Sequence, residues 1–443
     1  MSTPLAFEIA DCNCGRSHAM SSVYLPLKDL SSGCAVCGVN EEGRQRLCSS
    51  CGERIYCSED CQIKDWPKHK LNCGQTHRIN LESFYPVLAV LADFTRCLTL
   101  PPHFAVTSQV VSEPNPSLVP SQLPSGLQAK LLEVDDTRTS LFTDLFQWAP
   151  LAQSEPVARK MMQRIMRQGN ALPLLTALCV ALLGEMYTTT SGRNTGGVRT
   201  RLQYRTSPIA DFGIAAGSVK VHPSDRLAFR KRSTGTYVRG QDPAHHFWLY
   251  FTTVRGEEVL LDLSVFTFNL CMVVQSAPYA PPRLAAHAID VAPAYFVDRA
   301  IRKGAANIYT ERRRVSALRD ARLHRAVRYI QHGLDDAEAE LIGAFMRDVA
   351  GRSVTEREIE VAGTTTMQYC GLLGDVLQSE AWRRYPERPP LAIQADPGES
   401  VDPDDAPKRK NKNKKKKKKA SQSQGQGSSP TVEDLMAELG LGQ

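Results

Sequence analysis

The chain has no long apolar run. Its longest apolar stretch, residues 171–184, covers 14 positions, and a membrane-spanning helix needs ~20. The first 30 residues lack both the basic segment and the continuous apolar segment of a secretory signal peptide. We therefore expect an intracellular protein, nuclear and/or cytoplasmic, that does not contact membranes. Residues 171–184 are expected to form a buried core helix.

The chain does have eight potential zinc ligands within forty positions near its start. They form four pairs, spaced C-x2-C, C-x2-C, C-x3-C and H-x3-C: Cys34 and Cys37, Cys48 and Cys51, Cys57 and Cys61, and His69 and Cys73. A structural zinc ion is bound by four sulfur or nitrogen donors in a closed tetrahedron. Each pair, on a tight turn or a helical turn, supplies half of such a site. The sequence therefore predicts two zinc ions (Zn²⁺).

The order of these ligands resembles the MYND zinc finger. Tyr56 stands just before Cys57, Gln62 just after Cys61, and Trp66 three residues before His69. The resemblance covers residues 34–73. It implies two interleaved sites, one formed by the first and third pairs and the other by the second and fourth: Cys34, Cys37, Cys57 and Cys61, and then Cys48, Cys51, His69 and Cys73. Because so short a segment buries little apolar surface, metal binding must supply its folding free energy.

The resemblance also implies a function. MYND fingers bind short proline-containing peptides of partner proteins, through residues that correspond here to Gln62 and Trp66. An aromatic face beside an amide suits an extended proline-containing strand. In the alternative interpretation, Trp66 only caps the small core of the finger. We expect a zinc-binding protein–protein interaction module, acting as a nuclear or cytoplasmic adaptor or regulator.

Some proteins with this finger are lysine methyltransferases of the SET type, and the chain lacks their motifs. Such an enzyme would carry Asn-His-Ser-Cys and Gly-Glu-Glu-x-x-x-x-Tyr after the finger. Residues 256–258 are Gly-Glu-Glu, but the tyrosine is missing. Residues 192–197 are glycine-rich but lack the Lys-Ser/Thr of a phosphate-binding loop. The sequence therefore predicts that the chain is not an enzyme.

The alternative is an enzyme or pseudoenzyme with a transglutaminase-like body. That layout places a cysteine at a helix N-terminus, a histidine on a strand and an aspartate on the next strand. His246 and Asp262 suit the last two roles, but Ala171 stands at the nucleophile position. Cys179 lies eight residues further along the apolar helix, where a thiol is usually a small buried hydrophobe.

Six cysteines remain: Cys12, Cys14, Cys97, Cys179, Cys271 and Cys370. They are too widely spaced for a disulfide framework, and free thiolate ligands need a reducing compartment. Cys12 and Cys14, together with His18, offer three metal donors without a fourth. Whether they bind metal is left open.

The fold class predicted for the whole chain is α+β. A two-zinc finger is followed by an α+β domain over residues 81–385, with a linker-like segment at 101–126. Strands with β-branched and aromatic residues are expected in an antiparallel sheet, including a hairpin that turns at residues 255–257. The expected strands are 198–204, 246–254, 258–263 and 265–274, and the expected helices are 81–100, 126–133, 140–148, 156–168, 172–187, 313–333, 335–349 and 365–385.

Residues 386–443 are expected to be a disordered tail. Within it, residues 408–419 carry ten positive charges between flanks rich in Pro, Ser, Gln and Gly. Nuclear import, contact with nucleic-acid phosphates and simple solubility are the alternatives for this block. Because no aromatic residue is interleaved with the lysines, any binding to nucleic acid would be non-specific and salt-dependent.

Overall fold

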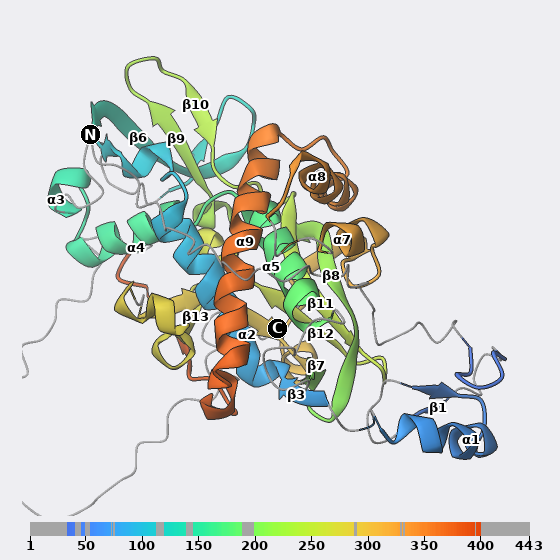
Figure 1. Ribbon diagram of the computed structural model, residues 1–443. Coiled ribbons are helices and arrows are strands. Elements are labelled where there is room, and N and C mark those ends of the chain that lie inside the picture. Colours follow the sequence, from blue (N-terminus) through green and yellow to red (C-terminus); the bar gives the residue numbers. More distant parts are fainter. Residues whose placement is uncertain are drawn as a thin grey trace, which may run out of the picture.

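The computed structural model contains a small finger and a larger body of helices and sheets (Figure 1). The finger consists of β1 (Arg46–Leu47), β2 (Ile55–Tyr56) and α1 (Glu59–His69). The body begins at β3. The structure describes residues 33–39, 46–48, 54–71, 73, 76–111, 119–138, 145–187, 199–287, 290–327, 330, 333–394 and 396–399.

Seven strands form the main sheet of the body. The β3–β7 pair is parallel, and the other described pairs in this sheet are antiparallel. At its centre β8 pairs with β11, with Gly217 opposite His246. The strand order is β15 (Tyr295–Val297), β12 (Glu258–Asp262), β11 (His246–Thr253), β8 (Ser207–Val219), β7 (Arg199–Tyr204) and β3 (Thr76–Asn80), and β16 (Tyr309–Ser316) also pairs with β8.

The predicted hairpin joins β11 to β12. Gly256 adopts φ +75°, a conformation that glycine reaches without the steric cost of a side chain. Its amide donates to the carbonyl of Thr253, whose own amide donates to Glu257. The turn fixes the register of the two strands, so that Leu249 lies opposite Leu261.

Helices cover one face of this sheet and share its largest apolar core. Figure 1 shows α2, α5 and α9 lying across the strands. As expected, α5 is buried along almost its whole length, which suits a helix that is apolar on all sides. Helix α8 begins at a capping box between Asp335 and Glu338, and α9 begins at a second one. These helices are α2 (Leu81–Phe94), α5 (Ala171–Met186), α8 (Asp336–Ala350) and α9 (Glu356–Gln378).

A second sheet and two short helices form a separate apolar cluster. Trp148 is buried in this cluster and donates its indole N–H to the carbonyl of Ala105. The sheet contains β10 (Tyr237–Arg239), β9 (Leu227–Lys231), β6 (Gln128–Arg138), β4 (Ser108–Val110) and β5 (Ser121–Gln122), packed beside α3 (Leu145–Trp148) and α4 (Glu155–Met166).

A third, three-stranded sheet has the order β14 (Val291–Pro293), β13 (Met272–Gln275) and β17 (Leu391–Ile393). The remaining short elements are η2 (Thr95–Thr99), η3 (Phe104–Val106), η5 (Pro223–Asp225), η6 (Val265–Phe268), η7 (Ala277–Tyr279), η8 (Pro282–His287), α6 (Arg299–Gly304), α7 (Ala321–Ala326) and η10 (Ala381–Arg384).

The α+β class is confirmed, but several expected elements differ. Residues 126–133, expected as a helix, belong largely to strand β6. Lys130, Leu132 and Val134 are buried and alternate with less buried residues, as on a strand. Because an inward-facing lysine breaks the apolar alternation, the sequence pattern concealed this strand. Residues 313–333, also expected as one helix, divide between β16 and α7.

The expected boundaries also change. The linker-like segment 101–126 contains η3, β4 and β5, which join the second sheet. The body continues beyond residue 385, because β17 pairs with β13 and Glu399 is fully buried.

Among the described residues no single helix is long and apolar enough to cross a membrane. Helices α4 and α5, bent by 65°, meet that criterion only as a pair, by length and composition.

Candidate metal centre and interaction site

Four cysteine sulfurs of the finger converge on one point. The Sγ atoms of Cys34, Cys37, Cys57 and Cys61 all lie within 4.8 Å of one another. The Cys37–Cys57, Cys57–Cys61 and Cys37–Cys61 separations are 3.4, 3.6 and 3.9 Å. A tetrahedron with Zn–S bonds of ~2.3 Å has edges of about 3.8 Å. The sulfurs are therefore spaced as a four-thiolate zinc site requires, and they are too far apart to be disulfides.

The electrostatics of this cluster also call for a cation. Burial opposes ionisation of Cys34, yet the backbone amides of Cys37, Val36 and Cys57 lower its pKa to about 6. The neighbouring sulfurs of Cys37, Cys61 and Cys34 act in the opposite direction on Cys57 and raise its pKa to about 12. Four thiolates this close repel one another unless a positive ion lies between them. A zinc ion supplies that charge.

The second cluster is formed by Cys48, His69 and Cys73, whose ligand atoms also lie within 4.8 Å of one another. The Cys48 and Cys73 sulfurs are 3.7 Å apart. Cys51, expected as the fourth ligand, lies outside the described residues. Among the described ligands the two clusters follow the interleaved pairing, because the first pair meets the third and Cys48 of the second pair meets the fourth. Together they are consistent with two zinc ions.

Local structure explains how the ligands are positioned. Ser58 caps α1 by accepting the amide of Cys61, which places Cys57 just before the helix and Cys61 in its first turn. His69 ends the helix, and the amide of Cys73 donates to the carbonyl of His69. The amide of Ala35 donates to Ile55, which attaches the first cysteine pair to β2.

A small polar core beneath the ligands was not found from the sequence. Tyr56, almost fully buried, donates its hydroxyl to Asp65 at 2.8 Å. Arg54 binds the same carboxylate through two nitrogens, at 2.9 and 3.2 Å. The hydrogen bonds from Arg54 outweigh burial and lower the pKa of Asp65. The tyrosine of the motif was the one feature of the sequence that could have indicated this polar core. Only the fold shows that its partner is Asp65.

The predicted peptide-contact residues lie on α1. Trp66 is 45% exposed, and its ring meets the His69 ring edge-on at 6.0 Å. Ile63, three residues before Trp66, is 62% exposed. Pro67, directly after Trp66, is also exposed, and Gln62 is half-buried. Trp66 therefore contacts a zinc ligand and still leaves close to half of its surface in solvent.

The body brings His246 and Asp262 together. The His246 Nε2 atom lies 2.5 Å from the Asp262 carboxylate, and both side chains are fully buried. Tyr309, which the sequence analysis did not single out, donates to the same carboxylate at 2.9 Å. On the other side of the ring, Gln241 lies 3.4 Å from His246 Nδ1 and accepts the amide of Gly169. His246 is thereby linked to the N-terminus of α5.

The cysteine-triad layout needs a thiol at the start of α5, and the residue at that position is alanine. Ala171 begins α5, directly after Asn170, which adopts a left-handed conformation with φ 52°. Cys179 lies two turns further on and has no exposed surface; burial raises its pKa.

Cys12, Cys14 and His18 lie outside the described residues, as do residues 400–443 with the lysine-rich block.

The comparisons with known proteins concern the finger. Residues 34–73 match the family model described as MYND finger. The Zinc finger MYND domain-containing protein 10 homolog of Drosophila melanogaster is 44% identical over 48 residues, 11% of this chain and 10% of that protein. N-lysine methyltransferase SMYD2 is 39% identical over 53 residues in Gallus gallus, 12% of each chain, and 37% over 50 residues in Homo sapiens, 11% of each chain.

These matches correct one prediction. The expectation that the chain is not an enzyme is overturned, because relatives that share its finger are named N-lysine methyltransferases. The chain spans only about a tenth of the length of the relatives, so the matches do not show catalysis by its body. No solved structure matches the chain significantly. What the matches and the sulfur geometry establish together is that residues 34–73 are a MYND zinc finger, a protein-interaction module with two Cys/His metal clusters.

Proposed function

We propose that the finger binds a proline-containing peptide of a partner protein through the exposed side of α1. The main observation behind this proposal is the exposure of Ile63 and Trp66, two large apolar side chains three residues apart on the same helix. Large apolar side chains gathered on a surface commonly mark an interaction site. Gln62, beside them, offers an amide that can bond to an extended backbone. We define Gln62, Ile63, Trp66 and Pro67 as the finger face.

Two features of the finger face support a peptide rather than a large protein surface. The finger is small, and its apolar residues lie on one helix of 11 residues. An extended peptide buries little area on such a helix, so we expect roughly micromolar affinity, typical of interfaces well below ~1,200 Å². Proline suits the site because an extended proline-rich segment loses little conformational entropy and packs flat against an aromatic ring.

The test is titration of the full-length chain with a fluorescent proline-rich peptide. Trp66→Ala and Gln62→Ala should each weaken binding while the zinc content remains unchanged. Tyr237→Ala removes a similarly exposed aromatic ring from the body, 41% exposed, and should leave binding unchanged. If Trp66→Ala lowers the zinc content, the ring is part of the finger's structure; if binding is unaffected in both finger variants, the proposal is wrong.

A second candidate function belongs to the body and rests on the contact between His246 and Asp262. We infer that they form the imidazole–carboxylate half of a cysteine-triad layout. Ala171→Cys introduces a thiol at the start of α5. Peptide-mapped alkylation should then label position 171 rapidly, and adding His246→Asn should slow the labelling. Equal rates in the two variants would contradict this inference.

A further inference from the structure

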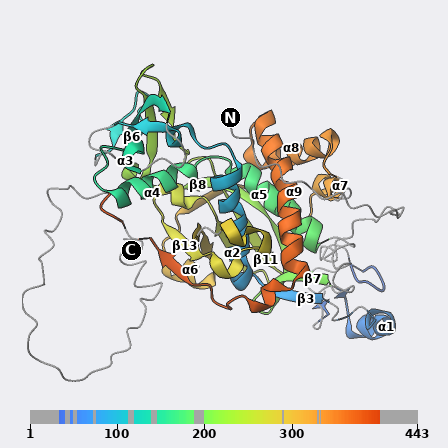
Figure 2. The same ribbon diagram turned by 60° about the vertical axis from the view of Figure 1, so that its left-hand side comes forward.

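The last described segment of the chain is fastened to the body. We call residues 391–394 and 396–399 the C-terminal strap. Its first part is β17, which pairs with β13 so that Ala392 lies opposite Val273. The amide of Gln394 then donates to the carbonyl of Cys271. Figure 2 shows this red segment beside β13. The strap ends at Glu399, a residue with no exposed surface.

Three cations surround the Glu399 carboxylate. Lys130 comes from β6, and Lys160 and Arg164 lie one turn apart on α4. Their side chains are 0%, 4% and 0% exposed. The Lys130 ammonium lies 3.3 Å from Glu399 Oε1, Arg164 bonds to the same oxygen, and Lys160 lies 3.5 Å from Oε2. We call Lys130, Lys160 and Arg164 the cationic cluster.

One member of the cluster, Arg164, is held in place by contacts outside the strap, whereas the Lys130 and Lys160 ammonium groups contact Glu399 and Asp396 of the strap. The guanidinium of Arg164 also donates to the carbonyls of Thr267 and Asp225, at distances of 3.2 and 2.6 Å from its Nη2. These contacts tie α4 to η5 and η6, so the cation would stay in position if Glu399 left. A donor that is held in position without its occupant is one mark of a binding site, as opposed to charges that only gather around a side chain.

Positive charge exceeds negative charge in this region. Besides Glu399, Asp396 lies within 3.5 Å of Lys160, so three cations face two carboxylates. Asp396 also accepts the amide of Glu399 at 2.9 Å, which fixes the turn of the strap. Burial opposes ionisation of Glu399, but the charges of Arg164, Lys130 and Lys160 outweigh it and lower its pKa. Without a carboxylate, the cluster would hold uncompensated positive charges, which is costly.

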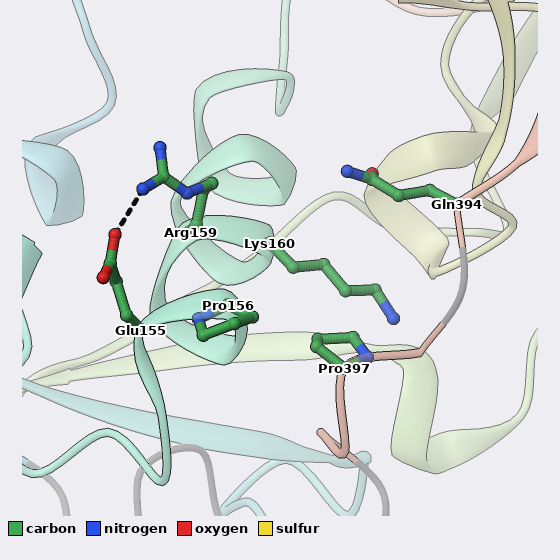
Figure 3. Close-up of a pocket in the computed structure, with 6 residues that line it drawn as sticks. All are labelled: Glu155, Pro156, Arg159, Lys160, Gln394 and Pro397. Carbon is green, nitrogen blue, oxygen red and sulfur yellow. Dashed lines mark hydrogen bonds and ion pairs between the residues drawn. The ribbon is translucent and has the colours of Figure 1, made fainter. Parts of the chain in front are cut away.

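A cavity reaches one member of the cluster, Lys160. It has a volume of about 320 Å³ and lies between α4 and the strap, where Lys160 is one of the lining residues. Figure 3 shows the Lys160 side chain extended across it toward Pro397, with Gln394 on the far wall. Lys160 has only long contacts to its two carboxylate partners, 3.5 Å each. A small anion entering here meets two cationic side chains, Lys160 and Arg159, of which Arg159 is already paired with Glu155.

We propose that the cationic cluster is an oxyanion-binding site that the chain fills with its own Glu399. The strap is then a built-in occupant, and a carboxylate or phosphate group competes with it. Because the strap also supplies β17, displacement of Glu399 loosens the β13–β17 pairing. The intramolecular occupant acts at an effective concentration in the millimolar range or higher, so a free competitor must be present at comparable concentrations.

Chemical rescue of full-length Glu399→Ala tests the site. The variant should melt several degrees below the wild type, and acetate or phosphate should restore the melting temperature saturably. Chloride at equal ionic strength should not. Comparison with the wild type removes the general stabilising effect of phosphate, and acetate and phosphate arms show which oxyanion the cluster prefers. Glu340→Ala removes a carboxylate of α8 that is 63% exposed and outside this cavity, and should show neither the loss nor the rescue.

Glu399→Gln provides a second variant if the alanine variant fails to fold, because it keeps the size and removes the charge. Competition is measured on the wild type by hydrogen exchange. Phosphate at tens of millimolar should speed exchange in peptides covering β13 and β17, relative to chloride at equal ionic strength. Rescue no greater than that given by chloride, or exchange unchanged by phosphate, would overturn the proposal and leave Glu399 as a purely structural ion-pair partner.

Discussion

At the scale of single residues, the zinc ligands differ from the other cysteines by what surrounds their sulfur atoms. Cys61 faces two further thiols within 3.9 Å, whereas Cys179 is enclosed by apolar side chains and has no exposed surface. A thiolate needs a neighbouring positive charge or hydrogen-bond donors, and an apolar enclosure keeps the proton on the sulfur. The same residue type is therefore a metal ligand in one place and a packing group in the other.

Loss of one ligand tests this distinction. Cys61→Ser removes a sulfur from a closed four-ligand site, so the finger should lose that zinc and unfold. Elemental analysis of the purified full-length protein should fall from two zinc ions per chain to one or none. Cys97→Ser, a substitution of the same type at a cysteine outside both clusters, should retain two. Two zinc ions in the Cys61 variant would disprove the assignment.

Glu258 gives a prediction for the dependence of stability on pH. Arg314 bonds to both of its oxygens, at 2.8 and 2.9 Å, and this pairing, together with Arg302, outweighs burial and lowers its pKa from 4.5 to about 2. Because the folded-state pKa lies below the unfolded value, the ion pair stabilises the protein above pH 4.5. That stabilisation is lost as the pH falls from 4.5 toward 2.

Glu258→Gln should therefore melt at a lower temperature than the wild type at pH 7, and the difference should shrink as the pH falls through this window. Thermal melts at several pH values measure it. Glu360→Gln alters a carboxylate that is 64% exposed in a surface pair with Arg357, so its effect should be small at every pH. A difference for Glu258→Gln that stays constant with pH would contradict the assignment.

At the scale of elements, the close approach of β8 and β16 depends on glycine. A Cβ atom at Gly217 would lie 2.1 Å from the carbonyl oxygen of Thr310 and 2.9 Å from the ring of Trp248. The first of these is a backbone atom of the paired strand, which cannot rotate away as a side chain can. The strand therefore has no room for even the smallest side chain at this position.

Gly217→Ala should accordingly destabilise the body by about 1–3 kcal/mol, the usual cost of forcing extra atoms into a packed region. Denaturant unfolding gives the free energy directly. Gly304→Ala is the matched control, because nothing lies within 4 Å of its added Cβ; its effect should be neutral or slightly stabilising. Equal stability of the Gly217 variant and the wild type would show that β16 shifts without cost.

At the scale of the whole molecule, the described part of the body ends with the strap, and the lysine-rich block follows it in the sequence. Truncation after Pro407 removes residues 408–443, which include the lysine-rich block 408–419. It leaves β17 and Glu399, so the melting temperature of the body should not change. We also predict that this truncation reduces nuclear accumulation, since it removes ten positive charges. Fluorescence imaging and thermal melts measure the two effects separately.

Truncation after Pro390 is the matching control for the stability half of this prediction. It also removes the strap, leaves β13 without its β17 partner and empties the cationic cluster of its carboxylate. The melting temperature should then fall clearly. If the shorter and longer truncations melt alike, the strap contributes nothing to the body. If the Pro407 truncation accumulates in the nucleus like the full chain, the import prediction is wrong.

The sequence determined the finger almost completely. Metal ligands must occur at fixed short spacings, so Cys34, Cys57 and their partners are recognisable without any tertiary information, and their pairing followed from the resemblance. The apolar helix α5 and the hairpin at Gly256 were likewise predictable, because both depend on neighbours in sequence. Partners such as Arg54 and Asp65, although only 11 residues apart, could not be matched, because many surface charges offer the same pattern.

The polar interior of the body, by contrast, depends on contacts between residues far apart in the sequence. Glu399 meets Arg164 across a sequence separation of 235 residues, and Tyr309 meets Asp262 across 47. No local pattern encodes such contacts, since each depends on which strands and helices the fold brings side by side. Strand β6 was not predicted for the same reason. Lys130 breaks the apolar alternation that marks a strand, and a lysine is buried there only because it pairs with Glu399, 269 residues further along the chain.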